Sequence, residues 1–167
     1  LIVKHQGIRW TYREYQQQVD RLACGLLALG IKPGDRVGIW APNCYEWCLT
    51  QFATAKIGAI MVCINPAYRL YELEYALNKV QCKAIIAAEQ FKTSDYLGML
   101  QELAPELANA EPGKLQAEKL PDLRIVIRMG EAATAGMFNF LAVLDLGGDK
   151  EKARLAQTAA ELSPGDA

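Results

Sequence analysis

The chain has 167 residues, of which 51% are hydrophobic and 22% are charged, and its formal net charge is −1. This length suits one domain or a large part of one, with enough apolar residues for a buried core. The charge leaves no basic surplus to neutralise a phosphate backbone, which argues against nucleic acid as a partner. The longest apolar run, residues 58–64, is far shorter than the roughly 20 residues that span a bilayer, so we expect no transmembrane segment.

The first part of the chain predicts a helix followed by a strand. Thr11 and Glu14 form a T-x-x-E capping box, and the apolar residues that follow recur at the spacing of one buried helical face. Gly30 is placed to close this helix in the left-handed conformation. A Pro-Gly-Asp turn then leads into a predicted strand from Arg36 to Trp40.

The next segment predicts a second helix and a second strand. Asn43 and Glu46 repeat the capping pattern, and Gly58 is expected to end the helix that they begin. Residues 60–64 are continuously apolar, which indicates a strand buried on both faces of a parallel sheet.

Further along, the same alternation of helix and strand continues, with Ser94 as the expected cap of one helix and a polar loop over residues 109–121. The predicted elements are a helix over 71–79, a strand over 84–88, a helix from Ser94 that Pro105 interrupts, a strand over 123–129 and a helix over 150–162, followed by a turn at 163–166. This order predicts an α/β fold with a doubly wound, mainly parallel sheet and helices on both faces. We expect one domain part over 1–167, with its core at about 7–130 and a tail or insertion at 131–167.

Several features invite a functional interpretation that their setting does not favour. The nucleotide fingerprints G-x-x-x-x-G-K-[ST] and G-x-G-x-x-G do not occur, and Gly147–Lys150 indicates a surface turn. His5 has no nearby nucleophile, and Glu72 and Glu74 lie two apart on a helix and so point to different faces. The sequence analysis therefore assigns no catalytic, cofactor-binding or metal-binding residue.

The cysteines number five, an odd count, and none forms a C-x-x-C pair. Cys44 and Cys48 are four residues apart on one helical face, which could be a ligand pair but is more typical of small buried hydrophobic residues. With a single histidine in the chain, a zinc site of familiar spacing is not expected. This pattern is typical of a reduced, intracellular protein.

The sharpest local motif is Asn65-Pro66-Ala67-Tyr68, which follows a predicted strand. We interpret it first as a turn that ends the strand, because Pro removes a ladder donor and Asn bonds to nearby backbone. The alternative is a ligand site, since α/β sheets bind ligands at the carboxyl ends of their strands. Trp40, Tyr45 and Trp47 could line an acyl pocket, although aromatic residues at such positions are more often part of the core.

Three blocks carry a resemblance to a known family: Gly30–Asn43, Ile64–Tyr68 and Glu72–Leu77. They resemble the N-terminal region of the adenylate-forming (AMP-binding) enzymes, in the branch of the fatty-acid–CoA ligases. The resemblance implies the first subdomain of the large domain, and for the parent protein it implies ATP, Mg²⁺, a fatty-acid substrate and coenzyme A. The acyl chain length stays open.

In that family a Ser/Thr/Gly-rich loop ending in Pro-Lys-Gly and a C-terminal lysine serve the chemistry, and neither has a matching position here. We therefore expect an N-terminal fragment that is inactive alone, that binds none of these cofactors (ATP, Mg²⁺ and coenzyme A) by itself and that self-associates through an exposed apolar face. The alternative is a stand-alone α/β binding or interaction module. A nucleotide-binding protein in its own right is disfavoured by the missing glycine loop.

Localisation follows from the same resemblance. We expect the protein to be intracellular, cytoplasmic if bacterial and mitochondrial if animal. The N-terminus lacks the basic-then-apolar layout of a signal peptide, and a targeting segment upstream of Leu1 stays open.

Overall fold

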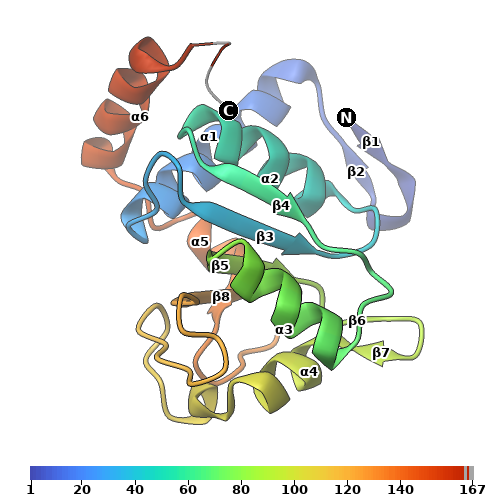
Figure 1. Ribbon diagram of the computed structural model, residues 1–167. Helices are drawn as coiled ribbons and strands as arrows, with labels where there is room; N and C mark the ends of the chain where they lie inside the picture. Colours follow the sequence, from blue (N-terminus) through green and yellow to red (C-terminus); the bar gives the residue numbers. More distant parts are fainter. Residues whose placement is uncertain (164, 166–167) are drawn as a thin grey trace. The chain divides into compact units, whose positions relative to one another are not determined.

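A computed structural model describes residues 1–163 and 165 of the chain (Figure 1). These residues form two compact units, and the chain passes between them several times. The first unit comprises residues 1–35, 43–61 and the described part of 142–167, and the second comprises residues 36–42 and 62–141.

The first unit is mainly helical. Its elements are β1 (Ile2–Val3), the 3-10 helix η1 (Lys4–Gln6), β2 (Ile8–Arg9), α1 (Tyr12–Ala28), α2 (Tyr45–Lys56) and α6 (Asp149–Glu161), and the short helix α5 (Phe140–Val143) leads into it. β1 and β2 pair in antiparallel fashion, and α1 contacts both α2 and α6.

The predicted ends of α1 are confirmed. The Thr11 side chain accepts from the Glu14 amide, and the Glu14 carboxylate accepts from the Thr11 amide at 2.8 Å. Gly30 has φ = +82°, in the left-handed region, and its amide donates to the Leu27 carbonyl at 3.0 Å. On the buried side of α1, Gly25 faces the backbone of Val143, and a Cβ at Gly25 would overlap the Val143 carbonyl oxygen.

The predicted cap of α2 is wrong. The N-cap lies one residue later than Asn43, and the side chain that caps the helix comes from a residue distant in the sequence. Cys44 is the N-cap and makes no side-chain cap bond. Instead, the Gln6 side-chain oxygen accepts from the Tyr45 amide at 2.8 Å, and the Gln6 amide group donates to the Glu46 carboxylate at 2.9 Å. Gly58 ends the helix as predicted, with φ = +68°.

α6 confirms the helix predicted over residues 150–162. Its first turn is closed by the Glu151 carboxylate, which accepts from the Gly148 amide at 2.9 Å. Thr158 is the buried residue of this helix, so its surface is largely open to solvent. The turn predicted at 163–166 includes Pro164 and Asp166, which lie outside the described residues.

The second unit is built on a parallel sheet. The strand order is β4-β3-β5-β8-β9, and β3 (Arg36–Trp40), β5 (Cys82–Ala87), β8 (Ile125–Arg128) and β9 (Phe138–Asn139) pair in parallel. The chain crosses from the first unit to the second within β4 (Ile60–Cys63). The remaining elements of the second unit are α3 (Leu70–Lys79), β6 (Gln90–Phe91), β7 (Ser94–Asp95), α4 (Tyr96–Leu103) and the 3-10 helix η2 (Pro105–Ala108).

One hydrophobic cluster joins this sheet to α3 and α4, which lie side by side in Figure 1. Leu73 and Leu77 of α3 and Leu100 of α4 are buried in it. The polar segment predicted as a loop over residues 109–121 also contributes, since Leu115, Ala117 and Leu120 are buried in the same cluster.

The burial predicted for the strand over residues 60–64 is wrong for residues 60–63 and right for Ile64, which follows the strand and is buried. β4 stands first in the strand order, at the edge of the sheet, and none of its four residues is buried. Ile60 is 40% exposed, and Cys63 is exposed as well. An apolar run shows that a strand forms, but its burial depends on which strands lie beside it.

The cap predicted for α4 is displaced by one residue. The Asp95 side chain, rather than that of Ser94, accepts from the Gly98 amide at 2.9 Å, while Ser94 is buried in β7. Pro105 starts η2 directly after α4, as the sequence predicts for an interruption.

The α/β class and the parallel sheet predicted from the sequence are thus confirmed. Within the part of the chain that the structure describes, no helix has both the length and the apolar composition needed to cross a membrane.

Candidate functional site

Three polar residues of the second unit lie at or just beyond the carboxyl ends of its strands. Asn65 follows β4, Glu89 follows β5, and Arg128 is the last residue of β8. Parallel strands present these ends at one edge of a sheet, which is where α/β folds hold ligands. This edge is therefore where a ligand site is expected.

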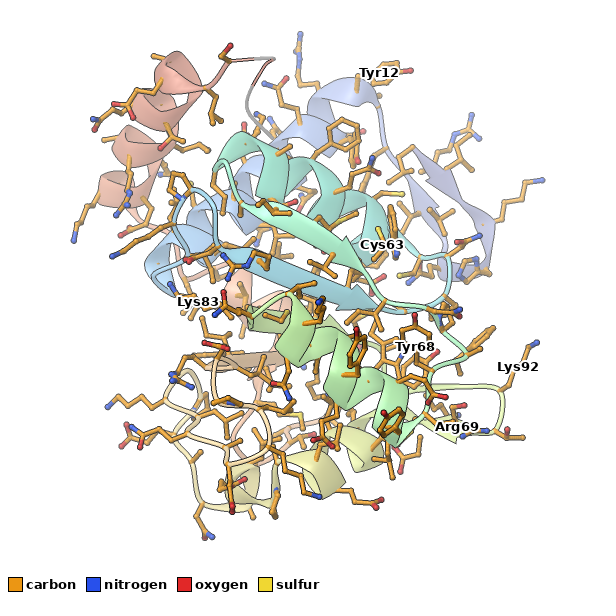
Figure 2. The ribbon with its side chains drawn as sticks, viewed as in Figure 1. Tyr12, Cys63, Tyr68, Arg69, Lys83 and Lys92 are labelled. Atoms are coloured by element: carbon orange, nitrogen blue, oxygen red, sulfur yellow. The ribbon has the colours of Figure 1, made fainter. Side chains whose placement is uncertain are left out.

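A groove of about 400 Å³ lies there, between the turn after β4 and the β6–β7 hairpin. Figure 2 shows Arg69 beside the start of α3 and Lys92 on the hairpin. The residues that line the groove are Asn65, Pro66, Ala67, Arg69, Phe91, Lys92, Thr93 and Ser94.

The turn on one side of the groove has the structure predicted for Asn65-Pro66-Ala67-Tyr68. The Asn65 side-chain oxygen accepts from the Ala67 amide at 2.9 Å, and the Asn65 carbonyl accepts from the Tyr68 amide at 3.0 Å. The predicted turn is therefore confirmed. The ligand-site alternative stays a prediction, and the groove places this turn where that alternative requires it.

The hairpin on the other side presents a lysine in an unusual conformation. Lys92 has φ = +54°, in the left-handed region that costs a residue with a Cβ about 1 kcal/mol. Its Nζ lies 5.4 Å from the centroid of the Phe91 ring, and the residue is exposed. With the exposed Arg69 on the opposite side, the groove has two cations and can receive an anionic group.

Replacing Lys92 with glycine distinguishes the contribution of the lysine charge to anion binding from any effect on the stability of the fold. The Lys92→Gly variant relieves the left-handed strain, so its melting temperature should hold or rise. Its affinity for inorganic pyrophosphate, measured by calorimetry, should fall about three- to tenfold because one of two cations is gone.

The matched control is Gln81→Gly, because Gln81 is also a non-glycine residue with positive φ, at +52°, and does not line the groove. This variant should relieve similar strain and bind pyrophosphate with the same affinity as the unsubstituted 167-residue chain. Equal pyrophosphate affinity in Lys92→Gly and Gln81→Gly would show that Lys92 does not serve the groove.

The aromatic residues considered for an acyl pocket lie in different places. Trp40 is fully buried and stacks on Tyr96 in the core of the second unit, with ring centroids 3.8 Å apart. Tyr45 and Trp47 are half-buried on α2 in the first unit, where Tyr45 contacts Trp10 edge to face. Trp40 therefore has the core role that its position favours.

The cysteines and the single histidine form no site among the residues that the structure describes. Within residues 1–163 and 165, no group of three or more His, Cys, Asp and Glu side chains could hold a metal ion. Burial raises the pKa of the Cys44 and Cys82 thiols to about 12, so both are neutral near pH 7. Cys48 is half-buried, and His5 lies exposed in η1.

The remaining candidates have local structural roles. The Glu72 carboxylate accepts from the Arg69 amide at 3.1 Å and so closes the first turn of α3. Gly147 packs closely against Cys24, and Gly148 is the N-cap of α6. Gly147–Lys150 thus forms the entry to a helix.

Sequence reasoning missed Arg69, Lys92 and Arg128. The first two are isolated basic residues in the sequence, and only the fold brings them to one groove. Arg128 ends an apolar strand and is 2% exposed. A charged residue at the carboxyl end of a predicted parallel strand is the one signal that could have indicated it.

Comparison with known proteins identifies the family. The model of the family described as AMP-binding enzyme matches residues 1–160. The mitochondrial medium-chain acyl-CoA ligase ACSF2 of Danio rerio is 51% identical over 127 residues, which are 76% of this chain and 21% of that protein. The corresponding protein of Rattus norvegicus is 45% identical over 151 residues, which are 90% of this chain and 24% of that protein.

A solved structure shows the same fold. Acetoacetyl-CoA synthetase from Streptomyces lividans superposes with a TM-score of 0.69 at 24% identity, over 87% of this chain and 22% of that one. The chain thus spans between a fifth and a quarter of the length of these relatives. The blocks between Gly30 and Leu77 resemble acyl-CoA synthetase family member 2 in particular, and the comparisons confirm that resemblance. The chain belongs to the AMP-binding enzyme family.

Proposed function

We propose that this chain is the N-terminal part of an ATP-dependent fatty-acid–CoA ligase. Such an enzyme joins a carboxylic acid to ATP with release of pyrophosphate, and then transfers the acyl group from the adenylate to the thiol of coenzyme A. The observation that carries the proposal is the 51% identity to a medium-chain acyl-CoA ligase over three quarters of the chain.

The groove at the sheet edge suggests what these residues contribute. A fatty acid, ATP and coenzyme A all carry anionic groups, and Arg69 and Lys92 face a groove of about 400 Å³ from two sides. We infer that this groove holds an anionic group of one of the three substrates. Its position at the carboxyl ends of the strands supports that inference.

The chemical step needs groups beyond these. Activation of a carboxylate by ATP requires backbone and hydroxyl donors around the triphosphate and a metal ion against the developing charge. The described residues offer no acidic cluster that fits Mg²⁺, and the sequence has no phosphate-binding glycine loop. The described residues therefore supply no site for ATP activation with Mg²⁺, and we propose that the chain is inactive alone.

The purified 167-residue chain is expected to form no detectable acyl-CoA from ATP, coenzyme A and a series of fatty acids. Acyl-CoA formation is measured by mass spectrometry, and the native polypeptide isolated from the source serves as the positive control under the same conditions. ATP-dependent formation of acyl-CoA by the 167-residue chain would overturn the proposal that the chain is inactive alone. Absence of activity from a longer native polypeptide would overturn the ligase assignment itself.

We also propose that the same chain self-associates. β4 lies at the edge of the sheet with Ile60 exposed, and an exposed apolar edge strand can pair with another chain. Sedimentation velocity on the same preparation should show a mass that rises with protein concentration. A monomer at all concentrations would contradict this.

A further inference from the structure

Tyr96 connects the core of the second unit to the turn that borders the groove. It is fully buried at the start of α4, and its hydroxyl donates to the Pro66 carbonyl at 2.7 Å. Its ring stacks on Trp40 with an interplanar angle of 15°. The Trp40 indole in turn donates from Nε1 to the Asn65 carbonyl at 3.1 Å. Two buried aromatic residues thus hold two successive carbonyls of one turn.

Arg128 is linked to Tyr96 only indirectly, through Glu89. Its guanidinium donates to the Met129 carbonyl at 2.9 Å, to the Ala132 carbonyl at 2.7 Å and to the Glu89 carboxylate at 2.9 Å. The Glu89 backbone carbonyl accepts from the Tyr96 amide at 3.1 Å. A series of contacts therefore runs from the end of β8, through Glu89 two residues beyond β5, to the turn after β4.

Stability alone does not account for these polar groups. A buried hydroxyl or indole N–H adds only modest net stability, because each must first give up its hydrogen bond to water. What polar contacts add is direction, since each donor fixes one particular carbonyl. Here the Trp40 indole and the Tyr96 hydroxyl fix the carbonyls of Asn65 and Pro66, and both of these turn residues line the groove.

We propose that Tyr96 is a positioning residue that holds the Asn65–Pro66 turn in the geometry of the anion-binding groove. It acts through the turn and does not line the groove itself. The significance of this role for substrate binding rests on the proposed function, whereas the positioning of the turn does not.

Tyr96→Phe tests the proposal, because it keeps the stacked ring and removes the hydroxyl that reaches Pro66. The readout is hydrogen exchange at the buried Trp40 Nε1–H, followed by NMR, since that proton is released only when the turn opens. Exchange at this proton should become about tenfold faster, the effect of losing one hydrogen bond to a carbonyl. Backbone amides of β5, which report global unfolding, should change by less than about twofold.

The control is Tyr71→Phe, which removes the same hydroxyl from a tyrosine that is 80% exposed on α3. It should alter neither rate. Two results would overturn the proposal: an unchanged Trp40 rate in Tyr96→Phe, or an equal acceleration at Trp40 and in β5, which would make the hydroxyl a general contributor to stability.

Pyrophosphate binding by the same proteins separates this proposal from the proposed function. The affinity should fall in Tyr96→Phe and hold in Tyr71→Phe. If the unsubstituted 167-residue chain binds no pyrophosphate, the proposed anion-binding role of the groove is wrong. The exchange rates still decide whether Tyr96 positions the turn.

Discussion

Replacing Gly25 with alanine is expected to lower the free energy of unfolding by about 3 kcal/mol. A Cβ at this position overlaps the carbonyl oxygen of Val143, and Val143 is itself buried. The obstacle is backbone, which cannot rotate away as a side chain could. Either α1 or the segment around α5 must therefore shift, with loss of packing on both sides. Urea denaturation followed by circular dichroism measures the change.

Gly148→Ala is the matched control for this variant. Gly148 lies in the same unit, and the nearest atom to a Cβ there is the Glu151 carboxylate at 3.6 Å, an ordinary contact. Its cost should stay below about 1 kcal/mol, the usual difference between glycine and alanine at an N-cap. A Gly25→Ala variant as stable as Gly148→Ala would contradict the close approach of α1 to Val143.

Replacing Arg128 with alanine is expected to cost about 3 kcal/mol, through two effects of similar size. The first is a cavity where a long side chain had been buried at 2% exposure. The second is the loss of donors to the Met129 and Ala132 carbonyls. The Glu89 carboxylate adds little, because its side chain is 65% exposed and can be hydrated instead.

Arg124→Ala is the control, because Arg124 directly precedes the same strand. Arg124 is half-buried and donates to the Leu123 carbonyl at 3.0 Å, so its removal should cost less than about 1 kcal/mol. Thermal and urea denaturation of both variants measure the difference. Equal stability of the two variants would show that the buried guanidinium is not needed to hold the strand ends.

The parts of the fold that were predicted correctly are those whose signals lie within a few residues. The Thr11–Glu14 box, the left-handed Gly30 and the strand Arg36–Trp40 each depend on neighbours in the sequence. The Asn65–Pro66 turn belongs to the same class, since its side-chain bond reaches only to Ala67. Such features are decided by local sterics and hydrogen bonding.

The features that were predicted wrongly depend on residues far away in the sequence. The cap of α2 comes from Gln6, 39 residues before the amide that it accepts from. The exposure of β4 depends on the strand order, which an apolar run does not encode. The local sequence predicted that Asn43 caps α2 and that β4 is buried on both faces. In both cases contacts between residues far apart in the sequence determine the structure instead.

The candidate site could be predicted in part. Its turn and its place at the end of a strand follow from the motif at Asn65. The two cations could not be predicted, because Arg69 and Lys92 lie apart in the sequence and line one groove only in the folded chain. The contacts of Arg128 and Tyr96 likewise join three strand ends that are adjacent in space and distant in sequence.

We propose that this chain is part of a longer acid–CoA ligase, and the source transcript can be sequenced past the codon for Ala167 to decide this. The intact mass of the native polypeptide would confirm the reading frame. We expect a Ser/Thr/Gly-rich loop ending in Pro-Lys-Gly soon after Ala167, within a polypeptide about four to five times longer. A stop codon at this point, together with a native mass of 18.4 kDa, would contradict the ligase assignment and favour a stand-alone binding module.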